Sequence, residues 1–459
     1  MRPMEVPKGI FGFLPGRTIV LLSASLMSVF WNIAINAQQI PDSLSFGQTV
    51  EIALANDNNV QAARAVFDAS TNDIARARAD YYPKLFLAGN YSHVSLTNEL
   101  SLNLPFPGGD RKIKIATDNP FSTGFTMTGE IFTFGRRPAA VAVAGANNRT
   151  DELRYKNMRK IIFDLAARAY ISVVFCEQSS GLLRTESRRF DLIAKLVEDR
   201  YALGTISEYE VLQTKLRQEN YRSSAIEMTN NLASARLNLA KLLNIPEEKL
   251  PGLIDNLDDS LLIIPAADSW QDIWERREDY LDAHNAVEKA KSIRRIAKSG
   301  YFPDVSLFAS YLWRNGNQPD LNQIKGSYSL GINLNWLLFD GFGRRAEIRK
   351  NDQLIKAASI SADEYRRTIP NQIKNQFLML QNSRSKIEIQ AKALALAEKA
   401  MSIARTRFEI GDLTMIEFLD TENNLALAEL GLLKSKLDYL VNQLDLKKVT
   451  GFYPEFENK

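Results

Sequence analysis

One motif occurs twice in this chain, 207 residues apart. RYALGTISEYEV begins at Arg200 and RFEIGDLTMIEF begins at Arg407, with arginine, an aromatic residue, glycine, a hydroxyl residue and glutamate at matching positions. Two further pairs of segments follow the same order: DYYPKLFL from Asp80 with GYFPDVSL from Gly300, and EIFTFGRRPA from Glu130 with WLLFDGFGRRAE from Trp336. The chain is therefore an internal duplication of a unit of about two hundred residues, which is too long for a solenoid repeat.

Each unit is predicted to begin with a helix, which is followed by segments that alternate between apolar and polar residues. Leu330, Ile332 and Leu334, for example, alternate with glycine and asparagine. This period predicts strands at about 85–98 and 121–134 in the first unit and at about 304–315 and 327–340 in the second. Aromatic residues lie in or near all four, which suits an outer-membrane barrel, although two soluble hairpins would alternate in the same way. Four strands cannot close a barrel of useful size, so a barrel requires several chains.

Long helices are predicted to follow the strands. Residues 136–202 and 344–408 contain few helix breakers, and each stretch would form a helix roughly 100 Å long. We expect Pro370 to kink the second of these helices. Return helices are predicted at 208–244 and 414–449, and the latter carries a heptad seam, typical of coiled-coil packing, at Leu419, Ala426, Leu430, Leu433, Leu437, Leu440 and Leu444.

The repeated motif is predicted to be the turn between each long helix and its return helix. Gly204 and Gly411 end the long helices, because glycine readily adopts the left-handed conformation that terminates a helix. The return helices start with capping boxes, formed by Ser207 with Glu210 and by Thr414 with Glu417.

Asp420 follows one turn after Glu417 and has no capping role. Either it joins a ring of like charges at a constriction between several chains, or it is an exposed acid favoured by the helix N-terminus. The segment 412–414 contains no basic residue, so it offers no ion pair that would hold the tip closed.

The N-terminus resembles a cleaved signal peptide. Basic residues precede an apolar run that ends near Ala37, a plausible cleavage position, so residues 1–37 are predicted to be removed. An uncleaved membrane anchor is the alternative, because the run is close to the lower length limit for a spanning helix.

Composition argues against nucleic acid as a partner, since 57 basic residues are balanced by 54 acidic ones. With two histidines, one cysteine and no catalytic motif, no metal site, no cofactor and no enzymatic activity are expected.

Taken together, these motifs resemble those of the TolC-like outer-membrane efflux proteins, the outer-membrane channels of tripartite multidrug efflux pumps and type I secretion systems. The resemblance implies an α+β membrane protein. In the implied homotrimer each chain gives four strands to a shared twelve-stranded barrel, and its helices join an α-helical tunnel across the periplasm. The implied units are residues 38–245 and 269–452, with 246–268 as an equatorial linker and 453–459 as a C-terminal tail.

The resemblance also implies partners and sites. The partners would be outer-membrane lipid, a periplasmic adaptor (a membrane fusion protein) and an inner-membrane transporter of the RND or ABC class. Asp420 and Glu417 fall at the acidic tip position, and the implied adaptor docking residues are Leu203, Gly204, Ile410 and Gly411. The strand-to-helix junctions fall at Gly135, Arg136, Gly341, Gly343 and Arg344.

Two other functions would account for parts of the sequence. A secreted coiled-coil scaffold or adhesin without a pore would explain the heptads but not the four strands. An adaptor anchored in the inner membrane is disfavoured for the same reason.

Overall fold

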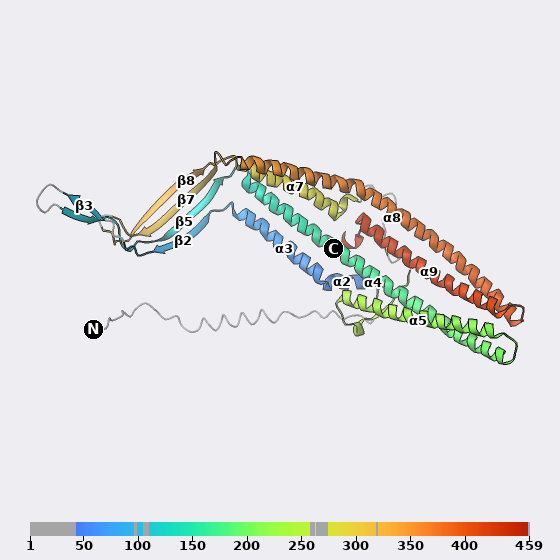
Figure 1. Ribbon diagram of the computed structural model, residues 1–459. Coiled ribbons are helices and arrows are strands. Elements are labelled where there is room, and N and C mark those ends of the chain that lie inside the picture. Colours follow the sequence, from blue (N-terminus) through green and yellow to red (C-terminus); the bar gives the residue numbers. More distant parts are fainter. Residues whose placement is uncertain are drawn as a thin grey trace, which may run out of the picture.

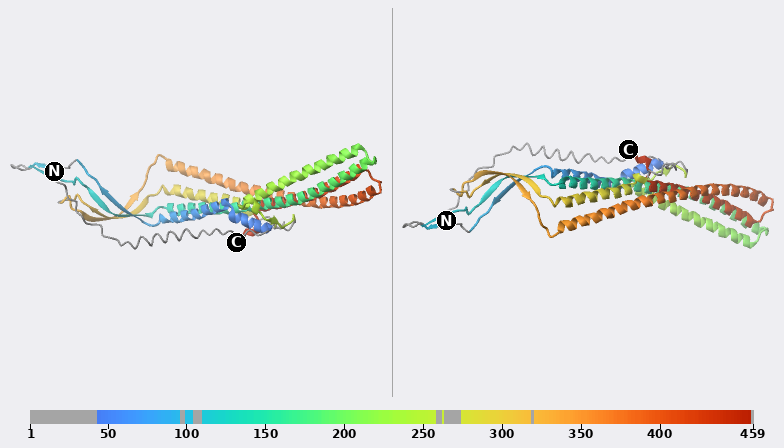
Figure 2. Two further views of the ribbon diagram at one scale, coloured as in Figure 1. Left: turned by 90° about the horizontal axis from the view of Figure 1, so that it is seen from below. Right: turned by 90° about the horizontal axis from the view of Figure 1, so that it is seen from above.

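The computed structural model of the chain describes residues 43–95, 99–103, 110–257, 262, 274–317 and 320–457. The expected signal peptide, residues 1–37 with its cleavage position Ala37, lies outside the described residues, as does most of the expected linker after residue 257. The molecule is elongated, with a β-sheet at one end and, at the other end, two turns that each connect a pair of helices (Figure 1). Figure 2 shows from two further sides that the strands continue into the helices along one long axis.

A four-stranded antiparallel sheet forms the first end. Its strands lie in the order β2-β5-β7-β8. Their bounds are Lys84–Tyr91 for β2, Phe121–Phe132 for β5, Asp304–Arg314 for β7 and Lys325–Asn335 for β8. A separate hairpin projects from this end and consists of β3 (Glu99–Asn103) and β4 (Asp110–Lys114).

Two of the expected strands are shorter than predicted. β2 ends at Tyr91 instead of continuing to about residue 98, because Pro120, just before the paired strand, has no N–H to donate to the ladder. β8 ends at Asn335 instead of about 340, because its neighbour β7 begins at Asp304, which pairs with Asn335.

The sheet has one apolar and one polar face. Leu87, Phe125, Tyr311 and Tyr328 form one cross-strand row, and the next row, on the opposite face, is Phe86, Thr126, Ser310 and Ser329. On β8 the apolar side chains of Leu330, Ile332 and Leu334 are 65–70% exposed. The described part of this chain therefore leaves the apolar face of its sheet uncovered.

The helices continue the sheet in the same lateral order. α3 (Asn58–Ala79) leads into β2, β5 leads into α4 (Arg136–Ala202), α7 (Glu278–Ser299) leads into β7, and β8 leads into α8 (Gly343–Glu409). Neighbouring helices pack as α3-α4-α7-α8. Both α4 and α8 contain 67 residues and are roughly 100 Å long. α8 continues through Pro370 as one helix, and Figure 1 shows that this helix bends between its ends.

Two return helices complete the far half. α5 (Glu208–Leu243) packs on α4, α9 (Met415–Thr450) packs on α8, and α4 packs on α9. The lateral order here is α5-α4-α9-α8. In the predicted heptad seam, Leu419, Ala426, Leu440 and Leu444 are each 1% exposed, while Leu430, Leu433 and Leu437 are half-buried.

A small mixed core surrounds the middle of α4. It contains α2 (Phe46–Asn56), α10 (Pro454–Glu457), the 3-10 turn η1 (Glu247–Lys249), and the parallel pair β1 (Ser43–Leu44) and β6 (Gly252–Leu253). A second 3-10 turn, η4 (Trp274–Arg276), packs against α7. The Tyr170 hydroxyl on α4 donates to the Leu44 carbonyl at 3.1 Å and contacts Asp255 at 2.8 Å. The C-terminal residues also pack here, because the Tyr453 and Phe456 rings both contact Phe163.

In the part of the chain that the structure describes, no helix combines the length and apolar character needed to cross a membrane.

Candidate functional site

The tip of the molecule consists of the two turns between the long helices and their return helices. Gly204 and Gly411 have φ angles of +72° and +78°, which glycine adopts without steric cost. The next amide in each turn closes the helix end: Thr205 donates to the Arg200 carbonyl at 3.0 Å, and Asp412 donates to the Arg407 carbonyl at 2.8 Å. The repeated motif thus ends two helices in the same way.

Both capping boxes are formed. The Glu210 amide donates to the Ser207 hydroxyl at 3.3 Å, and the Ser207 amide donates to the Glu210 carboxylate at 2.8 Å. The corresponding distances for Thr414 and Glu417 are 3.2 and 3.0 Å. The Thr414 amide and hydroxyl lower the pKa of the Glu417 carboxyl. Glu417 therefore serves as a cap in this structure.

Asp420 has a partner that the sequence did not indicate. Arg217 Nη2 on α5 donates to Asp420 Oδ1 on α9 at 2.5 Å, so the pair joins the two helical hairpins. One turn further from the tip, the Tyr221 hydroxyl on α5 donates to the Asn423 side-chain oxygen on α9 at 3.1 Å. Residues 412–414 contain no basic residue for an ion pair at the tip, and the arginine of this pair comes instead from the other unit.

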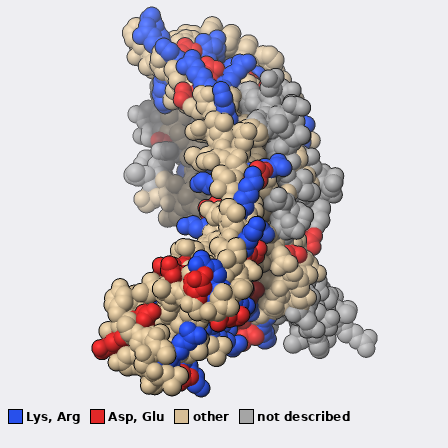
Figure 3. Space-filling view, turned by 90° about the vertical axis from the view of Figure 1, so that its right-hand side faces the viewer, with Lys and Arg blue, Asp and Glu red and all other residues tan. Residues whose placement is uncertain are grey.

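Apolar side chains are exposed beside the turns. Leu203 is 78% exposed and Ile410 is 73% exposed. Figure 3 views the molecule onto this end and shows acidic and basic side chains mixed over the surface that is not grey. The tip thus offers apolar contacts and no large surface of one charge in this view.

The strand-to-helix junctions contain consecutive residues with positive φ. These are Phe134 (+46°) and Gly135 (+88°) in the first unit, and Gly341 (+65°) and Phe342 (+70°) in the second. The equivalent residues are therefore again 207 positions apart. Aligning the two FGRR segments by their letters shifts the register by one residue, so Gly343 corresponds to Arg136 and not to Gly135.

Arg137 and Arg344 make equivalent contacts at the two junctions. Arg344 donates to the Gly300 and Leu338 carbonyls at 2.8 and 3.2 Å, and its guanidinium lies 4.9 Å from the centre of the Tyr301 ring. Each arginine thus ties the end of an incoming helix to the end of a strand.

The contacts of Arg137 correspond one by one to these contacts of Arg344. Arg137 donates to the Asp80 and Ile131 carbonyls at 3.3 and 3.0 Å and lies 4.8 Å from the centre of the Tyr81 ring. Sequence reasoning selected Arg136 in place of Arg137. The tyrosine two positions before each proline, Tyr81 in YYP and Tyr301 in YFP, was the available signal for this contact.

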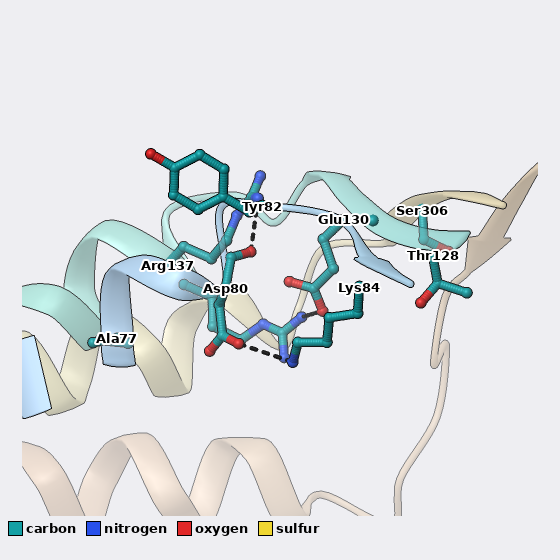
Figure 4. A pocket seen from close by; sticks show the side chains of 11 residues that line it. Ala77, Asp80, Tyr82, Lys84, Thr128, Glu130, Arg137 and Ser306 are labelled. Carbon is teal, nitrogen blue, oxygen red and sulfur yellow. Dashed lines mark hydrogen bonds and ion pairs between the residues drawn. The ribbon is translucent and has the colours of Figure 1, made fainter. Parts of the chain in front are cut away.

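Arg136 has a different environment. Its Nη2 lies 2.7 Å from Glu130 and 3.1 Å from Asp304, so it pairs with acids on β5 and β7. It lines a cavity of about 570 Å³ together with Lys84, Thr128, Glu130 and other residues (Figure 4). Since Lys84, Thr128 and Glu130 belong to the polar face of the sheet, the cavity lies on that side of the junction.

No group of three or more His, Cys, Asp or Glu side chains that could hold a metal ion occurs among the described residues.

Comparison with known proteins identifies the family. Residues 49–244 and 270–452 match the outer membrane efflux protein family. The chain is 22% identical to the pyoverdine export outer membrane protein OpmQ of Pseudomonas aeruginosa, over 92% of this chain and 86% of that protein. It is 23% identical to the alkaline protease secretion protein AprF of the same organism, over 88% and 84% of the two chains. The crystal structure of CusC superposes with a TM-score of 0.75 at 20% identity and covers 88% of this chain and 91% of that chain.

The family match spans most of the chain, and the fold agrees with it. The chain belongs to the outer membrane efflux protein family, and the resemblance to TolC-like channels is confirmed. It is an outer-membrane protein that serves as an exit duct for efflux or type I secretion.

Proposed function

We propose that three copies of this chain form one continuous passive duct, with a twelve-stranded barrel in the outer membrane and a helical tunnel in the periplasm. The observation that carries the proposal is the four-stranded sheet with an exposed apolar face and two open edges. A sheet of four strands cannot close on itself. The number three comes from the family resemblance.

The sheet edges supply the barrel contacts. Within the described residues, β2 and β8 each have one neighbour in the sheet, so each leaves a free edge. Pairing β8 of one copy with β2 of the next removes both edges and surrounds the barrel with an apolar band that faces lipid. The polar face, with Lys84, Thr128 and Glu130, then lines the interior.

The helices at the lateral edges carry unpaired apolar rows. Ile389, Leu396 and Ile403 on α8, together with Ile410 at its C-cap, repeat every seven residues and are 53–73% exposed. On α5, Tyr209, Leu216 and Leu237 are 51–61% exposed. A heptad row that is exposed in one chain is a surface for coiled-coil packing. Joining α8 of one copy to α5 of the next would continue the same helical wall around the tunnel.

The duplication gives the wall its regularity. α3 and α7 have 22 residues each, α4 and α8 have 67 each, and α5 and α9 have 36 each. These equal lengths support the two units proposed at 38–245 and 269–452. The equatorial linker 246–268 and the tail 453–459 would form a belt around the middle of the tunnel.

The tip is the proposed gate and docking end. Leu203, Gly204, Ile410 and Gly411 would contact a periplasmic adaptor, which couples the duct to an inner-membrane transporter of the RND or ABC class. Energy then comes from the transporter, and the duct needs no catalytic residue. OpmQ is named for the export of pyoverdine and AprF for the secretion of alkaline protease, so relatives of comparable identity carry different cargo and assign none here.

Light scattering and negative-stain imaging of the protein purified from membranes in detergent would test the assembly. We expect a particle of three chains, longer than the roughly 100 Å of one long helix. Leu396→Asp, in the exposed row of α8, should shift the mass toward one chain while helix content by circular dichroism is unchanged. A wild-type particle of one chain would contradict the shared barrel.

A further inference from the structure

A buried charged cluster lies where α4 of the first hairpin meets α9 of the second. Glu186 and Glu422 are each 1% exposed. Arg189 Nη1 lies 3.0 Å from Glu186 Oε1 and 2.6 Å from Glu422 Oε1. Glu429, on α9, extends the cluster away from the tip. One guanidinium thus bridges two buried carboxylates that belong to different hairpins.

Some carboxylate oxygens of this cluster lack a hydrogen-bond partner among the described residues. Glu186 Oε2 and Glu429 Oε2 are buried, and neither has a hydrogen-bond partner among the residues that the structure describes. Glu186, Arg189 and Glu429 line a cavity of about 460 Å³, whose apolar wall includes Leu182, Leu394, Leu432 and Leu433. Since three carboxylates share one arginine and the described residues contain no metal-binding group, protons and water remain to satisfy the free oxygens.

Titratable and charged groups from all four helices face the cluster. α5 contributes Tyr221 and Arg217, α8 contributes Glu398, and α9 contributes Lys436 at the cavity wall. Burial raises the pKa of Glu186 to about 7, with Arg189 opposing the shift and Glu422 and Glu429 adding to it.

The pKa values of Glu429 and Tyr221 are raised as well. Burial raises the pKa of Glu429, with Arg189 opposing the shift and Glu398 and Glu422 adding to it. Burial also raises the pKa of Tyr221 to about 12, so the tyrosine stays neutral while the glutamates titrate.

We propose that Glu186, Arg189, Glu422 and Glu429 form a proton-binding clasp that holds the hairpin α4–α5 against the hairpin α8–α9. A carboxyl whose pKa is raised in the packed state favours that state while it is protonated. Its contribution is present at low pH and is lost as pH rises through about 7. The clasp lies roughly 20 Å from the turn at Gly204, so loosening it would let the two hairpins separate at the tip. The effect on conduction rests on the proposed duct, whereas the effect on hairpin packing does not.

Hydrogen exchange in α9 of the purified full-length assembly tests the clasp directly. After correction for the intrinsic pH dependence of exchange, the opening equilibrium of α9 should rise about tenfold between pH 6 and pH 8, because one carboxyl then loses its proton in the packed state. In Glu186→Gln, which keeps the side-chain shape without the charge, this rise should disappear. Glu198→Gln is the matched control, because Glu198 is an exposed glutamate on the same helix that pairs with Lys215 at 2.8 Å.

Conductance of the same proteins in planar bilayers separates the clasp from the duct. A wild-type channel that opens more often at pH 8 than at pH 6, with no such change in Glu186→Gln, supports both proposals. If hydrogen exchange in α9 depends on pH but the protein conducts at no pH, the result supports the clasp and contradicts the duct. Wild-type α9 exchange that shows no corrected change between pH 6 and 8 would overturn the clasp, whatever the variants do.

Discussion

The Arg217–Asp420 pair is predicted to hold the tip closed. The two side chains are 23% and 57% exposed, and they join α5 to α9 at 2.5 Å. A partly exposed pair of this kind contributes about 0.2–1 kcal/mol. If three copies open together, the total is about 0.6–3 kcal/mol, which corresponds to an increase of about 3- to 150-fold in the open-to-closed ratio when the pair is removed.

Single-channel recordings in planar bilayers measure this ratio. Arg217→Gln, Asp420→Asn and the double variant should all raise the open probability by the same factor, because any one of the changes removes the whole interaction. Arg222→Gln is the control, because Arg222 lies on the same helix but pairs with Asp191 and Glu219 inside its own hairpin. It should leave the open probability unchanged.

Additive effects would refute the reasoning. The double variant could instead raise the open-to-closed ratio by the product of the factors measured for the two single variants. Arg217 and Asp420 would then act independently, and the contact between them would not hold the tip closed. A response of Arg222→Gln as large as that of Arg217→Gln would indicate a general effect of charge.

Three further predictions concern the junction, the cap and the pore. Arg344→Met should lower the unfolding free energy by about 2 kcal/mol because it removes charged hydrogen bonds to two carbonyls, while the exposed Arg345→Met should change little; thermal unfolding in detergent compares them. Thr414→Ala should cost about 1 kcal/mol in the first turn of α9 and speed hydrogen exchange there; equal exchange in the variant and the wild type would mean that the cap does not limit local opening. Asp420→Ala should raise the permeability of anions relative to cations, measured from reversal potentials in a salt gradient, and unchanged selectivity would remove Asp420 from the pore constriction.

Local signals predicted the helices closely. α4 begins at Arg136 and ends at Ala202 as predicted, and α9 begins at Met415, one residue after the expected start. These bounds follow from glycine turns and capping boxes, which act within a few residues of the chain. The strand ends were less predictable, because each strand ends where its neighbour can no longer pair.

The junctions show how a register error arises from sequence alone. FGRR occurs in both units, so the letters align Arg136 with Arg344. The structure instead gives Arg137 the contacts of Arg344. The positive φ angles that set this register are a property of the folded backbone and leave no distinct pattern in these residues.

The sequence by itself determined the duplicated plan of this protein: strands with one apolar face, helices that need neighbours, and two matching turns. These features follow from periodicity and from interactions between residues a few positions apart. Only the tertiary structure decided which side chains meet across the hairpins, including Arg217 with Asp420 and Arg189 with Glu422. Each of these pairs joins residues more than 200 positions apart, so their contact depends on the lateral order and vertical register of four helices, which no local pattern specifies.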